Sequence, residues 1–510
     1  MMIKTIKPFF LIFLTSLSPF LNFLAKNYVE LYFYDFLYTF VYFFFTFSFF
    51  YLIFFFFKKK FKFKIFFFIF FCYLILIFFN YNLIHSLSFL SNPDNFLSIK
   101  VLAQILWLII FIFSFYYLLK FLKKGFFVTF SLFFILFLNF SPGLKLFYQI
   151  LTIDKEQIKL STDYSSNIFT SIDKNNLQNV YYLLFDHYSR NDVYKKFYNF
   201  DNSLFLKEIE KYNFKVINNS ATNVVYTDVT MTSIFDMNLE RIKKYLNNDD
   251  SYEMGFWKSG DTVVQRIFKK VGYKHYMSLD ASMHGSPCKR KNLQNTNIDK
   301  CISQKIKFAE LEFNLLKMTP LFDILGKFFP SFFTYQFLYP SYITENLDSI
   351  IPNNQHIFYY MHFYMPHPPP KFGTNCKKQI QILDLKGDGP NAKYIGKKTK
   401  KAIVNDVKCI NKLIIDFVEK LDEIDPNAIV VIQSDNSNVG KLFPYTHYNL
   451  NLWKLPKSCH HMMSDDITNV NTFRIVFNCL GVGNWKMQKN EIIDSKFNRT
   501  SDEKGIKIYN

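Results

Sequence analysis

The chain has 510 residues and a net charge of +19, from 60 basic and 41 acidic residues. The first 140 residues hold twelve lysines and three acidic residues, which leaves a mild +10 for the remainder. Because lysine is interspersed with acidic residues there and forms no concentrated basic stripe, the composition argues against nucleic-acid binding.

Five apolar runs follow one another in the N-terminal part, and each is near the length of about 20 residues that spans hydrocarbon. They lie at about 9–25, 31–57, 64–80, 101–119 and 125–141. A single run of this kind also fits a buried core helix, but five in succession favour a transmembrane bundle. We therefore expect residues 1–141 to form a helical anchor in a lipid bilayer.

Lysines around these runs predict the orientation of the bundle, because cytoplasmic loops are rich in basic residues. Ten lysines precede the first run or follow the second and fourth, whereas the opposite side holds three. We expect a cytoplasmic N-terminus and an extracytoplasmic location for everything after Ser141, in a bacterial inner membrane. The first run also fits a signal peptide, and its cleavage would leave the C-terminal part on the same side. Polar residues 142–178 read as a juxtamembrane linker.

Residues 179–510 have the pattern of an α/β domain. Continuous apolar runs at 179–186, 356–362 and 428–435 are typical of strands buried on both faces, as in parallel sheets. Helical spacing of apolar residues between 407 and 424 ends at Pro426. A second helix is expected at 261–271, ended by Gly272, with a strand at about 274–279. Alternating strands and helices predict a domain with a mostly parallel central sheet.

Polar side chains end three of the predicted strands. Asp186, His362 and Asp435 each stand at the carboxyl end of an apolar run. Ligands bind at that edge of an open α/β sheet, so we expect these side chains to converge on one crevice. A single acidic residue at a strand end is more often a helix cap or a turn residue, but three coincident polar ends favour a site.

Several segments in this part together resemble a known family. They are NVYYLLFDHYSRNDVY at 179–194, a threonine-rich segment with TDVTMTSIFDMN at 227–238, MHFYMPHPPP at 361–370, VVIQSD at 430–435 and NVNTFRIVFN at 469–478. Their order and spacing resemble the sulfatase-like branch of the alkaline phosphatase superfamily. The nearest members in kind are membrane-anchored enzymes such as lipoteichoic acid synthases and phosphoethanolamine transferases.

The resemblance implies roles for particular residues. Asp186 and Asp435 match metal-binding acids, and Thr230 matches the nucleophile and a metal ligand, with Thr227 and Thr232 as competing choices. His362 and His367 match histidines of the substrate pocket or of a second metal. Without the resemblance, each of these residues has a structural explanation. Thr230 would be a helix cap, His362 a buried core histidine, and His367 an incidental residue of a rigid surface loop. Arg474 is better explained by a structural ion pair.

Two departures from the family pattern affect the expected chemistry. Asn436 follows Asp435 where the family has a metal-binding His, and its carbonyl oxygen can still coordinate the metal, as a weaker ligand than imidazole for zinc. No Cys-x-Pro-Ser-x-Arg segment is present, which argues against a formylglycine-type sulfatase. The resemblance implies a zinc-, manganese- or magnesium-dependent transferase or hydrolase of phospho- or sulfo-esters, acting on phospholipids or envelope glycans. The alternative is a catalytically degenerate relative that binds envelope material or a partner. A transporter is disfavoured, because Asp35 is the sole intramembrane charge.

Six of the seven cysteines lie in the polar part of the chain, and an even number in an exported domain is compatible with disulfides. Several of them also fit free buried thiols. We predict a disulfide between Cys288 and Cys301, which are close in sequence in a polar segment.

Overall fold

The computed structural model describes residues in both of the expected parts of the chain. The described residues are 3–27, 33–57, 126–152, 177–246, 262–279, 297–304, 337–352, 355–368, 370–378, 397–439, 442–495 and 506–509, with single residues or pairs between them. The chain divides into two compact units, Met1–Lys159 with Phe308–Phe328, and Leu160–Lys307 with Phe329–Asn510.

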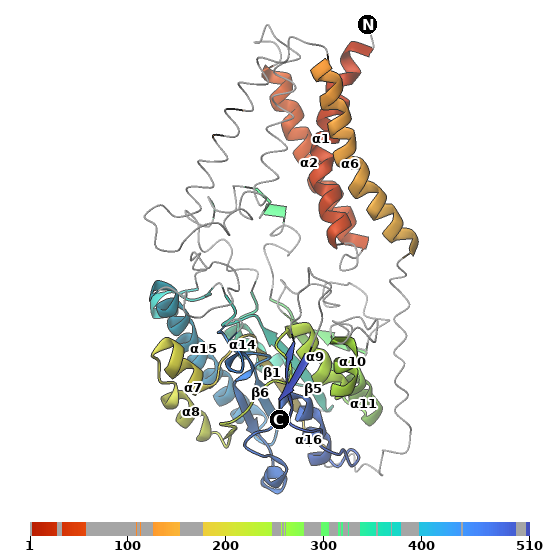
Figure 1. Ribbon diagram of the computed structural model, residues 1–510. Helices are drawn as coiled ribbons and strands as arrows, with labels where there is room; N and C mark the ends of the chain where they lie inside the picture. The colour runs from red at the N-terminus through yellow and green to blue at the C-terminus, as the bar shows by residue number, and fades with distance from the viewer. Residues whose placement is uncertain are drawn as a thin grey trace. The chain divides into compact units, whose positions relative to one another are not determined.

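The first unit contains three described helices, shown red to orange in Figure 1. They are α1 (Ile3–Asn27), α2 (Phe33–Phe57) and α6 (Phe126–Thr152). They match the first, second and fifth predicted spans, whereas those at 64–80 and 101–119 lie outside the described residues apart from isolated positions. Among the described helices, α2 is long and apolar enough to cross a membrane, over Phe36–Ile53. The five-helix bundle therefore stays a prediction.

Helix α6 continues past position 141, where the predicted span ended. Pro142 lies inside it and leaves the carbonyl of Leu138 without its usual helical N–H donor. The hydroxyl of Ser18, on α1, donates to that carbonyl at 3.5 Å. The amide of Asn139 donates to the Leu14 carbonyl of α1 at 2.9 Å. Polar groups of α1 and α6 therefore pair where the proline interrupts the helix.

The second unit is built on a seven-stranded sheet of order β2-β7-β6-β1-β5-β3-β4. Its strands are β1 (Val180–Phe185), β2 (Lys215–Val216), β3 (Lys274–Leu279), β4 (Lys300–Cys301), β5 (Ile357–Phe363), β6 (Ile429–Gln433) and β7 (Asn451–Lys454). Strand β1 pairs in parallel with β5 and β6, and β3 pairs in parallel with β5 and β4. Only β7 runs antiparallel to its neighbours β6 and β2. The predicted α/β domain with a mostly parallel sheet is confirmed.

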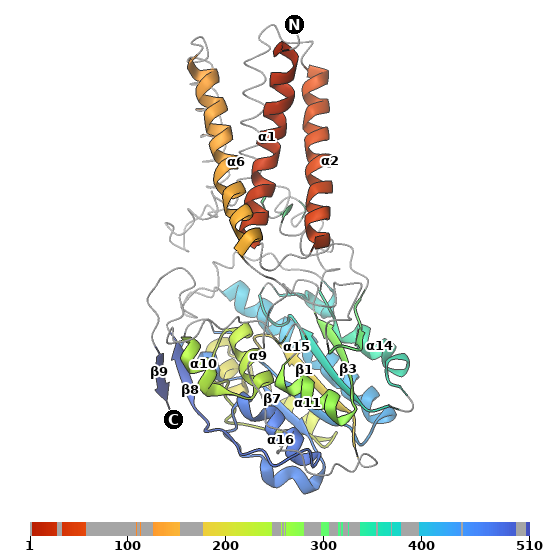
Figure 2. The ribbon, with the colours of Figure 1, turned by 90° about the vertical axis from the view of Figure 1, so that its right-hand side faces the viewer.

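Helices cover both faces of this sheet (Figures 1 and 2). One group contains α8 (Ser203–Glu210), α14 (Pro340–Ile350) and α15 (Lys397–Ile424). The other contains α9 (Thr227–Asp236), α10 (Leu239–Leu246), α11 (Val263–Val271) and α16 (Thr472–Cys479). Every side chain of β1, β5 and β6 is buried, as their continuous apolar runs predict. On the second face, Tyr182 and Tyr360 pack with Phe235 of α9 in one aromatic core.

Helix α11 shows how local sequence sets the boundaries of these elements. Thr262 and Gln265 form a reciprocal capping box at its N-terminus. Gly272 ends the helix with φ of 103°, a left-handed conformation that glycine adopts at little cost. The predicted end of this helix and the strand that follows it are therefore confirmed. A small antiparallel pair, β8 (Ile492–Ser495) with β9 (Ile506–Tyr509), completes the described elements.

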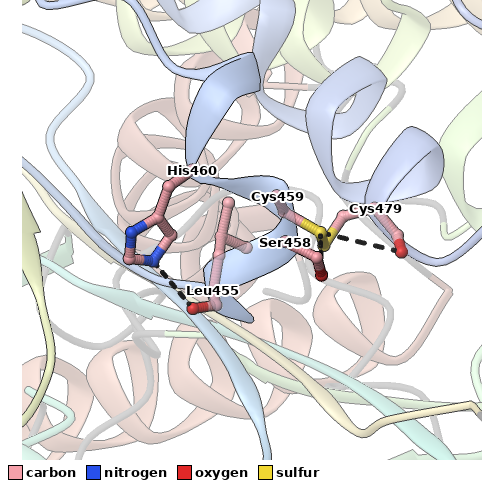
Figure 3. The surroundings of a disulfide bond; sticks show 5 residues. All are labelled: Leu455, Ser458, Cys459, His460 and Cys479. Carbon is pink, nitrogen blue, oxygen red and sulfur yellow. Dashed lines mark hydrogen bonds between the residues drawn. A yellow bond between two sulfur atoms is a disulfide. The ribbon is translucent and has the colours of Figure 1, made fainter.

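Two disulfides join distant elements of this unit. Cys376 pairs with Cys409 of α15, and Cys459 pairs with Cys479 at the end of α16. Figure 3 shows the second bond beside His460, whose Nε2 lies 3.1 Å from the Leu455 carbonyl oxygen. Cys301 is also disulfide-bonded. Its predicted partner Cys288 lies outside the described residues, so that pairing stays a prediction.

Candidate metal and catalytic site

The carboxyl ends of two adjacent parallel strands place two acidic side chains near each other. Asp186 directly follows β1, and Asp435 follows β6 by two residues. Both are buried, with 1% and 0% of their surface exposed. The backbone N–H of His187, next to Asp186, donates to Oδ1 of Asp435 at 3.1 Å. The strand ends expected to converge from the sequence therefore do so for these two residues.

Asp435 is held by hydrogen bonds from several directions. Its Oδ2 accepts from the Thr227 hydroxyl at 2.5 Å and from the Asn436 amide at 3.1 Å. The Ser434 hydroxyl lies 3.5 Å from Oδ1. Charge-assisted bonds of this kind are the stronger ones in proteins, and they fix the orientation of the carboxylate.

Thr227 is the first residue of α9 and is only partly buried. The N-cap residue, Tyr226, makes no side-chain cap. The first intrahelical bond in this turn runs from the Thr230 N–H to the Tyr226 carbonyl, at 2.7 Å. The backbone N–H groups that precede it have no intrahelical acceptor, and such groups favour an anion at the helix N-terminus.

The other two threonines of this helix point elsewhere. Thr230 is fully buried, and its hydroxyl donates to the Val224 carbonyl at 2.7 Å. The hydroxyl of Thr232, also buried, donates to the Asp228 carbonyl at 2.6 Å. Thr230 lies about 4.5 Å further along the helix axis than Thr227, since each residue rises about 1.5 Å. Of the three threonines, Thr227 is the one whose hydroxyl donates to Asp435. It lies about one helical turn before Thr230.

His187 and His367 lie beside Asp186. The Nε2 atom of His187 is 3.7 Å from Oδ1 of Asp186, and the two imidazole rings have centroids 4.2 Å apart. One ligand atom from each of the three residues falls within 4.8 Å of the others. His367 occupies the loop after β5, and its ring stacks on Tyr364 with centroids 4.1 Å apart. Burial, with the nearby His187 and Lys371, keeps the pKa of His367 well below its usual value.

The remaining sequence-predicted histidine, His362, is fully buried in strand β5. Its Nδ1 lies 2.9 Å from the Tyr360 hydroxyl, and its ring packs against Trp257 with centroids 5.6 Å apart. The structure therefore brings His367 to the acidic residues and leaves His362 within the aromatic core. Arg474 lies on α16, where its guanidinium donates to the carbonyls of Lys486 and Met237.

Asn436 presents its carbonyl oxygen without a hydrogen bond among the described residues, although only 4% of its surface is exposed. Its Nδ2 donates to the Val225 carbonyl at 2.9 Å and to Oδ2 of Asp435. Because both partners are acceptors, the amide orientation is assigned unambiguously. A buried oxygen in this setting suits a cation.

The donors present fit a divalent metal ion. Two buried carboxylates and the Asn436 carbonyl are oxygen ligands, which magnesium and manganese accept. Two imidazoles add nitrogen ligands, which zinc accepts. His187 belongs to this group and was missed from the sequence, although its place directly after Asp186 at a strand end was a visible signal.

Comparison with known proteins gives matches among solved structures alone. No family model matches the chain, and no curated protein matches it. The zinc complex of the C-terminal periplasmic domain of EcEptC from Escherichia coli is 13% identical, covers 66% of this chain and 93% of its own, and gives a TM-score of 0.42. The lipoteichoic acid synthase LtaP from Listeria monocytogenes is 16% identical, covers 66% of this chain and 78% of its own, and gives a TM-score of 0.37.

A third similar structure is the soluble domain of lipooligosaccharide phosphoethanolamine transferase A from Neisseria meningitidis. It is 11% identical, covers 64% of this chain and 96% of its own, and gives a TM-score of 0.38. These are proteins of the kinds that the sequence motifs resemble. At such low identity and TM-score, we assign no activity or residue role from these matches.

Proposed function

We propose that this chain is a divalent-metal-dependent enzyme that transfers or hydrolyses a phospho- or sulfo-ester through the hydroxyl of Thr227. The observation that supports it most is the hydrogen bond from Thr227 to Asp435 at the N-terminus of α9. A nucleophile needs an oriented hydroxyl, an acceptor for its proton and a site for the anionic group beside it. The hydroxyl of Thr227 is oriented by Asp435, which can accept its proton, and it lies at the N-terminus of α9, which can bind the anionic group. Thr230, which was expected to be the nucleophile from the sequence, is buried in the core.

In this proposal Asp186, Asp435, Thr227 and the Asn436 carbonyl hold the metal. A bound divalent ion lowers the pKa of a hydroxyl and polarises the oxygen of a phosphoryl or sulfuryl group. Asp435 orients the Thr227 hydroxyl and accepts its hydrogen bond. The first-turn N–H groups of α9 stabilise the anionic group under attack. His367 lies beside Asp186, where it would contact the substrate or a second metal ion.

The reaction proceeds in two displacements. The Thr227 oxygen forms a bond to phosphorus or sulfur, its proton passes to Asp435, and the ester bond breaks with its electron pair on the leaving oxygen, which takes a proton. An acceptor hydroxyl or a water molecule then attacks the phosphorus or sulfur and loses its proton to solvent. The bond to the Thr227 oxygen breaks with its electron pair on that oxygen, which takes the proton back from Asp435. Water as acceptor gives hydrolysis, and an alcohol gives group transfer.

We also propose that the domain acts outside the cytoplasm, on phospholipid head groups or envelope glycans. The distribution of lysines around the N-terminal apolar runs supports this orientation. The disulfides Cys376–Cys409 and Cys459–Cys479 agree with it, because disulfides persist in oxidising compartments.

The second candidate function is a non-catalytic protein that keeps the fold and binds envelope material. Asn436 favours it, because a neutral amide oxygen is a weaker ligand than imidazole for zinc. Metal dependence separates the two candidates. The full chain in detergent should turn over an aryl phosphate or aryl sulfate with manganese or zinc, and lose this activity in a chelator or in Thr227→Ala. If no divalent ion binds and no ester is cleaved, the non-catalytic function replaces the enzymatic one.

A further inference from the structure

His187 adopts a backbone conformation that its residue type rarely takes. Its φ is 65°, in the left-handed region, which residues other than glycine adopt uncommonly, although histidine is found there more often than most. Such a conformation persists where surrounding contacts impose it. Here the N–H of His187 donates to the buried carboxylate of Asp435, which fixes the turn.

This turn directs the imidazole back toward Asp186. The distance of 3.7 Å between His187 Nε2 and Asp186 Oδ1 is too long for a hydrogen bond. It is close to the separation of two ligands on one tetrahedral metal ion, which is roughly 3.4 Å when each bond is about 2.1 Å. The three ligand atoms of Asp186, His187 and His367 lie within 4.8 Å of one another, so small side-chain rotations would let them share a cation.

The surroundings of the three residues suit a catalytic metal. Asp186 is buried, whereas the His187 side chain is 19% exposed, so one side of the cluster opens to solvent. The His367 side chain is held in place by a contact of 2.6 Å between its Nδ1 and the Pro368 carbonyl oxygen. A neutral imidazole that donates from Nδ1 accepts at Nε2, which lies 3.2 Å from the Tyr364 hydroxyl, so a metal ion bound at Nε2 would replace that hydrogen bond. Three protein ligands with an open side are the arrangement of catalytic zinc.

We propose that His187 is a metal ligand, and that Asp186, His187 and His367 together bind a zinc-class divalent ion. This inference rests on the proposed function, because Asp186 is also one of the residues that hold the metal which that function needs. It goes further in naming a residue to which the family resemblance gives no role, and in predicting a nitrogen-preferring metal at Asp186.

The test compares metal binding by the full chain in detergent with that of His187→Gly. Glycine adopts the left-handed conformation freely, so this variant keeps the turn and removes only the imidazole. Zinc affinity measured by calorimetry should fall about 10- to 100-fold or more, as for lost metal-site interactions. The matched control is His461→Ala, which removes an exposed histidine of helix η12 (Lys457–Met462) and should bind zinc as the wild type does.

Cobalt provides a second readout. The visible absorption of cobalt bound to the wild type should change in His187→Gly, and millimolar imidazole should restore it by filling the vacated position. If His187→Gly binds zinc and cobalt as the wild type does, the ligand assignment is wrong and the proposed function stands. If the wild type itself binds no divalent ion, the proposed function fails as well.

Discussion

The Thr227 hydroxyl donates to the Asp435 carboxylate across 2.5 Å, which joins the first turn of α9 to the carboxyl end of β6. The two residues are far apart in sequence, and the parallel sheet brings them together. This contact selects one threonine from the three in TDVTMTSIFDMN, because only its hydroxyl combines partial exposure with an acidic acceptor.

The first prediction separates Thr227 from Thr230 as nucleophile. Thr227→Val should reduce turnover by more than about 100-fold, whereas Thr227→Ser, which keeps a hydroxyl, should retain measurable activity. Thr230→Val is the control, since it removes only the bond to the Val224 carbonyl and should cost about 1 kcal/mol of stability. Steady-state kinetics on folded protein, checked by thermal unfolding, measures both effects. Full activity in Thr227→Val with its loss in Thr230→Val would reverse the assignment.

A second prediction concerns Lys371, a fully buried lysine beside the site. Its ammonium donates to the carbonyl of His367 and lies 4.8 Å from the ring centroids of Phe337 and Tyr364. Lys371→Met keeps the aliphatic stem but removes the donor, so the His367 loop should lose its anchor. We expect zinc affinity about 10-fold lower, as when a group that supports a ligand is removed. Lys371→Arg should restore part of it, and unchanged calorimetric affinity in Lys371→Met would show that the loop is held by other contacts.

The third prediction concerns metal preference at Asn436. Its carbonyl is a neutral oxygen ligand, which suits manganese or magnesium better than zinc. Asn436→His should raise zinc affinity and, for an active enzyme, phosphoesterase activity. Competition between zinc and manganese, followed by calorimetry, measures the change. Equal zinc affinity in the two proteins would mean that position 436 does not contact the metal.

The fourth prediction follows from Asp406 on α15, where burial raises the pKa of the carboxyl to about 6 from 3.8. Between these two values the folded chain keeps a proton on this carboxyl that the unfolded chain loses. The protonated carboxyl therefore contributes its full share to the free energy of unfolding below about pH 4. This contribution is lost as the pH rises through about 6, by about 3 kcal/mol in all. Its Oδ1 accepts the backbone N–H groups of Lys371 and Phe372, which Asp406→Asn can preserve.

Melting temperatures of the wild type and Asp406→Asn at pH 4.5 and pH 7 measure this effect. Asp406→Asn should gain stability relative to the wild type at pH 7, because it carries no buried charge there. The gain should shrink at pH 4.5. A constant difference between the two proteins across this range would mean that Asp406 titrates normally.

The sheet of the second unit was predictable because its central strands are continuous apolar runs. The runs at 179–186, 356–362 and 428–435 became β1, β5 and β6 within one or two residues at each end. The short strands β2, β4 and β7 lack such a run, and their pairing depends on tertiary contacts. The pairing of the cysteines in disulfides could not be predicted either, because the spacing of cysteines in a sequence does not determine their connectivity.

The sequence was sufficient to predict the two acidic residues of the site, but not the threonine or the histidines beside them. Asp186 and Asp435 stand at the ends of recognisable strands, so topology alone brings them together. The choice between Thr227 and Thr230 needed the start of α9, since one helical turn decides which hydroxyl reaches Asp435. The position of the His187 side chain beside Asp186 depends on a left-handed backbone conformation at His187, which cannot be predicted from a histidine in the sequence. His362 looked like a strand-end residue, but its side chain points into the aromatic core.

The central claim is that Thr227 carries the transferred group, and peptide mass spectrometry of a trapped intermediate tests it most directly. The full chain in detergent would be incubated with manganese or zinc and an aryl phosphate or phospholipid, quenched in acid and digested. We predict a phosphoryl or substituted phosphoryl group on Thr227, and none in Thr227→Val. A modified Thr230 or Thr232, or turnover with no modified threonine, would contradict this account.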